Sequence, residues 1–327
     1  MSPARRASRP VFEIGDAVVK AGRKARTQIP ITKLVSGSPI SLPVLAVHGR
    51  HEGPTIWLNG AIHGDEVNGV EIIRRVLAQL DPRSLHGTVI AVPIVNVPGF
   101  LSGDRYLPDR RDLNRSFPGS SRGSLASRIA KIFMTEIVRR CTVGIDLHTG
   151  SGHRTNLPQI RANLDDPTTR ALADAFGAPL MMHAATRDGS LRQAGTEAGA
   201  TVLLYEGGEA WRYDETAIVA GTDGVLAVMA ALDMVSEAFD RTPPTPYISR
   251  RSRWVRARRS GLMQLAVDLG DRVDKGASLG RIHDSFGGRL GQINAPADGM
   301  VIGLNLDPSV NQGDALVHIA HNEGNHA

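Results

Sequence analysis

The chain has 327 residues, which is long enough for two domains, or for one large domain with a sizeable buried core. Its 41% hydrophobic and 22% charged residues exclude an intrinsically disordered or low-complexity protein. The single cysteine, Cys141, excludes an intramolecular disulfide and a cysteine-rich zinc site, and it favours a cytoplasmic location. The formal net charge of +5 favours acidic ligands only weakly and does not indicate nucleic-acid binding.

The sequence predicts no membrane segment. No stretch approaches the ~18 uninterrupted apolar residues that a membrane helix needs. The basic segment Met1–Pro10 is not followed by an apolar run of the kind found in export signals, so we expect a short frayed tail there.

From residue 42 onward, short apolar runs alternate with amphipathic segments. A strand over 42–47, a turn over 51–54 and a strand over 55–58 predict a hairpin, and a helix follows in which apolar residues recur from Val67 to Leu80. The next predicted elements are a strand over 89–95, a helix over 124–140, a strand over 143–147, a helix over 167–176, a strand over 201–205 and a helix over 215–239. Strands that alternate with long helices indicate an α/β fold with a mixed, largely parallel sheet flanked by helices.

The composition changes at a proline cluster, residues 241–246, where a helix cannot continue. We place a domain boundary there. The predicted organisation is an N-terminal tail and leading strand region over 1–40, a main domain over 41–242 and a small all-β, barrel-like domain over 247–321. In the last of these, frequent glycines separate short apolar runs.

Two histidines and a glutamate form the first candidate site. The junction Asn59-Gly-Ala-Ile-His63-Gly-Asp-Glu66 places an imidazole and a carboxylate three positions apart where a helix begins. Positions i and i+3 share a helix face, so both side chains can reach one ion. Taken alone, such a pair is more often a surface ion pair or a helix cap. His148, however, follows the strand over 143–147 at its carboxyl end, where open α/β sheets build their sites. Two histidines and a glutamate are a common ligand set of hydrolytic zinc centres, and cobalt or manganese would also fit.

Two further motifs add to this site. The segment Asp112-Leu-Asn114-Arg115, with Arg105, Arg110 and Arg111 upstream, offers forked donors for a substrate carboxylate. The segment Leu203-Leu-Tyr-Glu206-Gly-Gly places an acid at the end of an apolar strand, where it is costly unless it serves a site. Arg154 and Arg161 either face the substrate or lie exposed on a helix or loop.

These motifs, taken in order with Asp146-Leu-His148-Thr149, resemble the succinylglutamate desuccinylase/aspartoacylase family. Members of this family are zinc-dependent amidohydrolases related in fold to zinc carboxypeptidases. The resemblance covers the chain from about Thr55 to Gly208. It implies that one Zn²⁺ per chain is bound by His63, Glu66 and His148, and that Glu206 is the general base that helps a zinc-activated water attack an amide carbonyl.

The same resemblance assigns the residues around the metal. It implies that Asn114 and Arg115 hold a substrate carboxylate and that Asp112 orients His63. It also implies an arginine that polarises the scissile carbonyl. Compared with aspartoacylase, two extra residues lie between Arg105-Tyr106 and Asp112. We expect Arg105 to polarise the carbonyl, with Arg111 as the alternative. Arg111 is also expected to bind the substrate.

The C-terminal segment resembles a biotinyl/lipoyl-type flattened β-barrel. At the hairpin where a carrier domain presents its lysine, this chain has Asp284-Ser-Phe-Gly-Gly288, and Lys275 belongs to an earlier turn. We therefore expect a scaffold or a lid beside the zinc site. The strip Arg250–Arg259 holds six arginines and Trp254, but no RNA-binding motif accompanies it, so we expect no nucleic-acid partner.

The leading hypothesis is a cytoplasmic zinc-dependent amidohydrolase that removes the acyl group from a small N-acylated amino acid or a related N-acyl amine. The alternatives are a metallocarboxypeptidase acting on peptides and a non-catalytic binding module. The acyl group and the amine are left open by the sequence. The family resemblance favours a homo-oligomer, although no helix shows a heptad seam.

Overall fold

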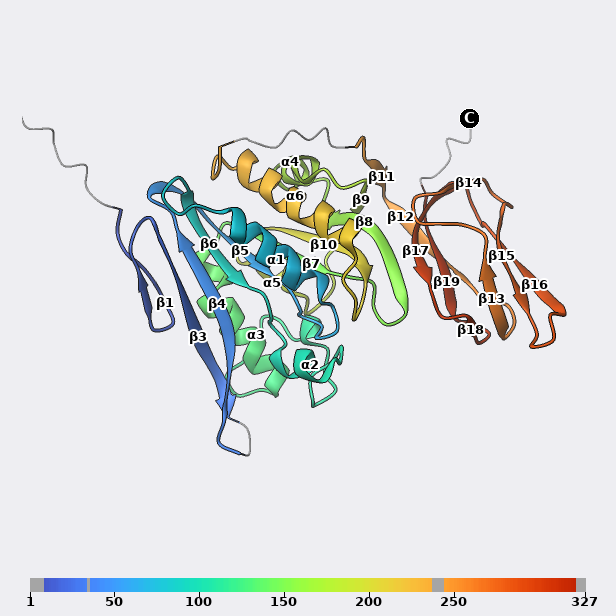
Figure 1. Ribbon diagram of the computed structural model, residues 1–327, viewed down its shortest axis with the longest axis horizontal. Coiled ribbons are helices and arrows are strands. Elements are labelled where there is room, and N and C mark those ends of the chain that lie inside the picture. Colours follow the sequence, from blue (N-terminus) through green and yellow to red (C-terminus); the bar gives the residue numbers. More distant parts are fainter. Residues whose placement is uncertain (1–8, 34–35, 237–243, 322–327) are drawn as a thin grey trace, which may run out of the picture.

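The computed structural model describes residues 9–33, 36–236 and 244–321. Its main element is a 13-stranded sheet with the order β12-β19-β17-β8-β10-β7-β5-β6-β4-β3, to which β9, β11 and β14 attach at the side (Figure 1). The strands of this sheet are β3 (Arg23–Lys33), β4 (Pro39–His48), β5 (His51–Asn59), β6 (His86–Val92), β7 (Val143–His148), β8 (Arg154–Ala162), β9 (Leu180–His183), β10 (Thr201–Glu209), β11 (Tyr247–Ser249), β12 (Arg251–Arg256), β14 (Arg272–Val273), β17 (Gly299–Asn305) and β19 (Ala315–His321).

Two smaller sheets complete the β structure. One pairs β1 (Phe12–Ile14) with β2 (Ala17–Val19). The other is four-stranded and contains β13 (Gly261–Leu265), β15 (Ser278–His283), β16 (Arg289–Asn294) and β18 (Ser309–Val310).

The predicted fold class is confirmed, with the parallel arrangement concentrated at the centre of the sheet. Strands β6, β5, β7 and β10 run parallel to one another, whereas β3, β4, β17 and β19 pair antiparallel with their neighbours. The carboxyl ends of β5, β7 and β10 therefore meet at one edge of the sheet. In open α/β sheets this edge is where ligands bind.

Helices cover both faces of the central sheet because successive side chains of a strand point to opposite faces. On β5, the fully buried Ile56 and Leu58 belong to the apolar core that contains α1, α4 and α6, and Trp57 belongs to the core that contains α3 and α5. Burying each such side chain contributes roughly 1.5–3 kcal/mol. The helices are α1 (Asn68–Gln79), α2 (Val97–Ser102), α3 (Leu125–Glu136), α4 (Pro167–Phe176), α5 (Leu191–Glu197) and α6 (Glu215–Ala231), with short 3₁₀ turns at Leu113–Arg115 and Val138–Arg140.

The predicted hairpin at 42–58 is wrong. Residues 51–54 are the beginning of β5 and not a turn, and β6 lies between β4 and β5 in the sheet. Strand β5 runs parallel to β6, whereas β4 runs antiparallel to it. Residues 49–50 make the change of direction, and the Gly49 amide donates to the Gly87 carbonyl at the start of β6.

Most predicted helices are present, with shifts at their ends. Helix α4 has the predicted bounds because the Asp166 side chain accepts from the Thr169 amide at its start and Gly177 ends it at φ +68°. Helix α6 ends at Ala231, and Asp233 follows with φ +55°. The last residues of that predicted helix, 237–239, lie outside the described residues.

The C-terminal strands continue the main sheet. Strand β17 pairs antiparallel with β8, with Gly303 opposite Asn156, and β11 pairs parallel with β9. Figure 1 shows these strands at the right-hand end of the molecule. Part of the proline cluster at 241–246 lies outside the described residues, and the division into 1–40, 41–242 and 247–321 stays a prediction. Among the described helices, none combines the length and apolarity needed to cross a bilayer.

Candidate metal centre and active-site cleft

Two loops at the carboxyl edge of the sheet bring the predicted ligands together. His148 is the last residue of β7, and His63 and Glu66 lie in the loop between β5 and α1. The expectation that this pair shares a helix face is wrong, because α1 begins only at Asn68. A turn, in which the Glu66 amide donates to the His63 carbonyl at 3.1 Å, brings the two side chains together instead. Gly64 is required here, because a Cβ would lie 2.1 Å from the Gly99 carbonyl carbon.

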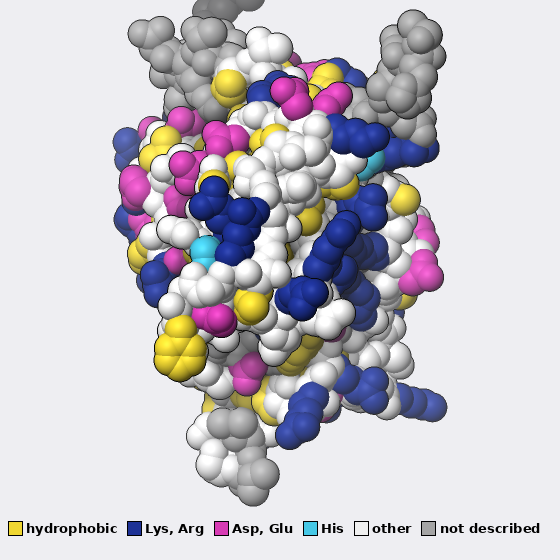
Figure 2. All heavy atoms as spheres, turned by 90° about the vertical axis from the view of Figure 1, so that its right-hand side faces the viewer, with side chains coloured by type: hydrophobic (Ala, Val, Ile, Leu, Met, Phe, Trp, Pro, Cys, Tyr) yellow, Lys and Arg dark blue, Asp and Glu magenta, His cyan; other side chains and the backbone are white. Residues whose placement is uncertain are grey.

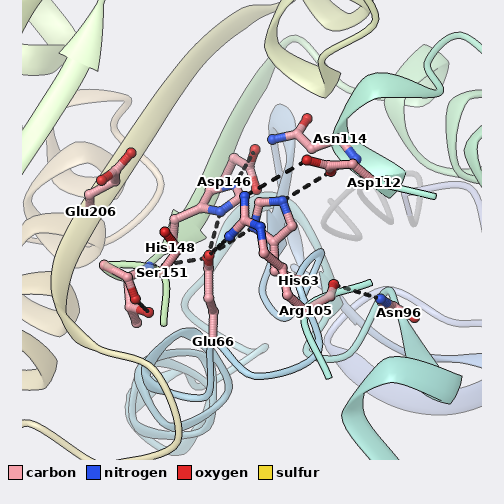
Figure 3. A network of polar contacts seen from close by, with 12 residues as sticks. His63, Glu66, Asn96, Arg105, Asp112, Asn114, Asp146, His148, Ser151 and Glu206 are labelled. Carbon is pink, nitrogen blue, oxygen red and sulfur yellow. Dashed lines mark hydrogen bonds and ion pairs between the residues drawn. The ribbon is translucent and has the colours of Figure 1, made fainter. Parts of the chain in front are cut away.

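The Glu66 carboxylate is the centre of the cluster shown in Figure 3. It is 1% exposed, and its two oxygens lie 2.8 Å from His63 Nδ1 and 2.7 Å from His148 Nδ1. The backbone amide of Thr149 donates to it at 3.2 Å, and Arg105 Nη1 donates to it at 2.8 Å. Two ring nitrogens and a carboxylate oxygen therefore converge within 4.8 Å of one another in a buried position.

A carboxylate lies behind each of the two imidazole rings. His63 Nε2 lies 3.1 Å from Asp112 Oδ1, as expected from the sequence. His148 Nε2 lies 3.0 Å from Asp146 Oδ2, although these atoms are not aligned as a full hydrogen bond. The sequence analysis missed this role of Asp146. The available signal was its position two residues before His148, since residues i and i+2 of a strand share a face.

Glu66, His63 and His148 shift one another's pKa values in a consistent way. Burial alone would raise the pKa of Glu66, but His63 and His148 hold it well below its usual range. Burial alone would lower the pKa of His148, but Asp146 and Glu66 raise it well above its usual range. The pKa of His63 is raised by Glu66 and Asp112 in the same manner, against its burial. The cluster therefore strongly favours an ionised carboxylate among cationic groups.

The residues present fit a zinc-type ion. Histidines that bind a metal through one nitrogen usually have a carboxylate or carbonyl at the other nitrogen, and both imidazoles here have one. Two histidines and a glutamate are also a donor set typical of catalytic zinc sites. A cation could replace the protons that His63 and His148 share with Glu66.

Arg105 lies in the cluster, and Arg111 does not. Besides its hydrogen bond to Glu66, Arg105 lies 3.8 Å from Asp112, and it lines the cleft. The Arg111 side chain is 64% exposed and lies 3.8 Å from Asp109, outside the residues that line the cleft. Only the first of the two expected arginines is therefore placed where it can contact a substrate.

Asn114 and Arg115 both line the cleft. The Asn114 side-chain oxygen accepts from the Leu191 amide at 2.8 Å, so its amide nitrogen is the group that it can offer to a ligand. The Arg115 guanidinium donates to the Asn114 carbonyl. These contacts hold two donors of the Asp112–Arg115 segment at the cleft.

Glu206 lies opposite His148 on the neighbouring parallel strand β10 but stands apart from the metal cluster (Figure 3). Its carboxylate accepts from the Asn156 side-chain amide and lies 3.5 Å from Arg161 Nε. Asn156 and Arg161 are on β8, so the expectation that Arg161 could lie on an exposed helix or loop is wrong. Asn156 was missed because its sequence context shows no motif.

These side chains line one cleft of about 420 Å³. One wall comes from the C-terminal strands, with Ser252 and Trp254 on β12 and His318 on β19. The C-terminal region therefore contributes directly to the cleft, in line with its expected place beside the site.

Residues 52–232 match the family described as the succinylglutamate desuccinylase/aspartoacylase catalytic domain. The chain belongs to this family. It is also 32% identical to N-alpha-acetyl-L-2,4-diaminobutyric acid deacetylase of Halomonas elongata over 296 residues, which are 86% of each chain.

Solved structures of other proteins have the same fold. The product-bound ectoine utilization protein EutE (DoeB) from Ruegeria pomeroyi superposes with a TM-score of 0.83 at 24% identity, covering 93% of this chain and 98% of that one. A succinylglutamate desuccinylase/aspartoacylase from Rhodobacter sphaeroides superposes with a TM-score of 0.78 at 27% identity, with the same coverage.

Proposed function

We propose that this chain is a zinc-dependent deacylase that hydrolyses the amide bond of a small N-acylated amino acid. The observation that carries the proposal is the convergence of two histidine Nδ1 atoms on the buried Glu66 carboxylate, at a cleft that Glu206 and Arg105 also line. Family membership and the deacetylase of Halomonas elongata support an acylated amino acid as the substrate class.

In the proposed reaction, His63, Glu66 and His148 would hold the metal. A bound zinc ion would lower the pKa of a water molecule and would polarise a carbonyl oxygen. Asp112 and Asp146 keep the two imidazoles oriented from behind.

Glu206 serves as the general base. Its carboxylate accepts a proton from the attacking water and returns one to the departing amine. Asn156 holds this carboxylate at the cleft through a hydrogen bond, and Arg161 keeps a positive charge beside it. Both contacts hold the carboxylate in one place beside the cleft.

The remaining cleft residues position the substrate. Arg105 donates to the carbonyl oxygen as negative charge develops there, since its guanidinium already contacts the candidate metal ligand Glu66. Asn114 and Arg115 bind the carboxylate of the amino acid, the former through its amide nitrogen and the latter through a forked guanidinium.

Amine release from a panel of N-acetyl, N-succinyl and N-formyl amino acids and short peptides tests the proposal. The wild-type protein is compared, zinc-loaded and chelator-treated, with a Glu206→Gln variant of equal zinc content. We expect release from small N-acyl amino acids that stops on chelation and falls ~100-fold or more in the variant. Release from peptides alone would instead assign a metallocarboxypeptidase, and zinc binding without any release would favour a binding module.

A further inference from the structure

Trp211 lies in the turn between β10 and α6 and is half-exposed, although tryptophan is mostly buried in folded proteins. Its backbone has φ +61°, in the left-handed region that a bulky residue rarely adopts. Such a conformation persists only where surrounding contacts hold it. The contacts that hold Trp211 therefore indicate what this turn does.

Two hydrogen bonds join Trp211 to two different loops of the metal cluster. Its backbone amide donates to the Asp65 carbonyl at 2.8 Å, and Asp65 directly precedes the candidate metal ligand Glu66. Its indole N–H donates to the Gly103 carbonyl at 2.7 Å. Gly103 ends α2 at φ +67°, and Arg105 follows two residues later. The turn therefore connects the loop that carries Glu66 with the loop that carries Arg105.

The other contacts of the Arg105 backbone are weaker. The Gly64 amide donates to the Arg105 carbonyl at 3.4 Å, and the Asn96 side chain donates to the same carbonyl at 3.3 Å. Figure 3 shows the contact with Asn96 beside the Arg105 side chain, which points at Glu66. Both distances are longer than the ~2.9 Å that is usual for such bonds. The shorter bonds of Trp211 therefore contribute most to the placement of this segment.

The charges around Arg105 leave its side chain one short anchor, the contact with Glu66 at 2.8 Å. A metal cation on Glu66 would repel the guanidinium and weaken this contact. Arg105 is also one of six arginines that line the cleft, and Figure 2 shows Lys and Arg side chains gathered across the middle of the face at the C-terminal end. Hydrogen bonds to the backbone of the segment do not depend on these charges, so they can keep Arg105 in place.

We propose that Trp211 is a positioning residue that fixes Arg105 against the candidate metal ligand Glu66. The inference rests on the proposed deacylase function, in which Arg105 donates to the substrate carbonyl. Within the described parts of the chain, the residues that line the cleft do not include Trp211, so it acts through Arg105 and not by touching the substrate. The His153 ring packs beside the indole, with centroids 5.6 Å apart, and supports the orientation in which the N–H meets Gly103.

A double-mutant cycle tests whether Trp211 acts through Arg105. Trp211→Phe keeps an aromatic ring beside His153 but removes the indole N–H. In the wild-type background we expect kcat to fall ~2–10-fold with little change in KM, because one hydrogen bond is lost. In the Arg105→Met background the same change should alter kcat by less than about twofold, since the group that Trp211 positions is absent. Steady-state kinetics on the best N-acyl substrate measure both effects.

Tyr213→Phe is the matched control. Tyr213 is an exposed aromatic residue near Trp211, between β10 and α6, and it is not among the described residues that line the cleft. The variant also loses one side-chain donor, but it should leave kcat and KM unchanged. Circular dichroism and zinc content check that all variants fold and bind metal alike.

Hydrogen–deuterium exchange measures the same contact without turnover. The Asp104 amide donates to the Gly99 carbonyl at 2.8 Å, so its exchange reports on the segment that the indole holds. In zinc-loaded Trp211→Phe we expect exchange at Asp104 to be ~2–10-fold faster than in the wild type, because the segment opens more often. Tyr213→Phe should keep the wild-type rate.

Three results would overturn the positioning role: an equal loss of kcat in both backgrounds, a rise in KM alone, or unchanged exchange at Asp104 in Trp211→Phe. Amine release by the wild-type protein separates this failure from failure of the proposed function. Release by the wild type, with unchanged kcat and exchange in Trp211→Phe, would keep the deacylase and reject the positioning role. Faster exchange without release from any compound would keep Trp211 as the residue that fixes the Arg105 segment and reject the deacylase.

Discussion

The Nε2 atom of His148 lies 3.0 Å from Oδ2 of Asp146, which is two positions earlier on the same strand. Asp146 is completely buried, and its other oxygen accepts from the Asn59 side chain at 2.6 Å across to β5. The rigid centre of the sheet thus sets the orientation of one imidazole. The Nδ1 atom of His148 consequently points at Glu66.

We therefore expect Asp146→Asn to weaken zinc binding by ~10–100-fold, because the variant loses the charge that orients and polarises His148. Competition with a chromophoric chelator measures the affinity, and circular dichroism checks the fold. Asp109→Asn is the control, since Asp109 pairs with Arg111 outside the cleft. An unchanged affinity in folded Asp146→Asn would contradict the role of this contact.

Arg105 and Arg111 offer a second comparison. Replacing Arg105 with Met should lower kcat by ~100-fold or more, because a donor to the developing oxyanion is lost. Arg111→Met should change kcat by less than about twofold, since that side chain is largely exposed. Steady-state kinetics on the best N-acyl substrate decide between them, and a larger loss in Arg111→Met would reverse the assignment.

Asn156 is expected to position Glu206. Asn156→Ala should lower kcat about 10-fold with little change in KM, because the variant loses the hydrogen bond that orients the Glu206 carboxylate. Zinc content should not change, because Asn156 does not contact the metal cluster. Asn311→Ala, in an exposed turn, serves as the control. A rise in KM alone would show that Asn156 binds substrate instead.

The buried ring of His318 predicts that the folded protein loses stability in acid. Its pKa is about 3 in the folded protein and near 6.5 when the chain is unfolded. Between these values the unfolded chain binds a proton that the folded protein does not, so stability falls as the pH decreases from 6.5 toward 3. His318 changes the free energy of unfolding by at most ~1.4 kcal/mol per pH unit.

Denaturant unfolding at pH 7, 6 and 5 measures this effect. The stability of His318→Gln should decrease less steeply with falling pH than that of the wild type. His86→Gln should keep the wild-type slope, because His86 is exposed on β6. Equal slopes for His318→Gln and the wild type would show that the buried ring does not contribute.

The three candidate metal ligands could be predicted because each belongs to a short motif next to a predicted strand. The reason given for His63 and Glu66 was nevertheless wrong, since a turn before α1 and not the helix itself joins them. Asn156 could not be predicted in the same way. It meets Glu206 across a pairing of β8 with β10, which joins segments 50 residues apart.

The predicted hairpin at 42–58 failed for a similar reason. Both strands exist, but β6 inserts between them because it pairs with β5 on one side and β4 on the other. Periodicity identifies a strand from its own residues, whereas the partner of a strand depends on segments that follow much later.

By itself, the sequence determined the α/β class, the order of most central elements, the family and the choice of His63, Glu66 and His148 as candidate metal ligands. These follow from residue type and local spacing, which short-range sterics and hydrophobic periodicity control. Only the tertiary structure decided that β17 joins β8 and that Trp254 and His318 complete the cleft beside Arg154. These contacts join distant segments, and their stability comes from burial and pairing that exist only once the sheet has assembled.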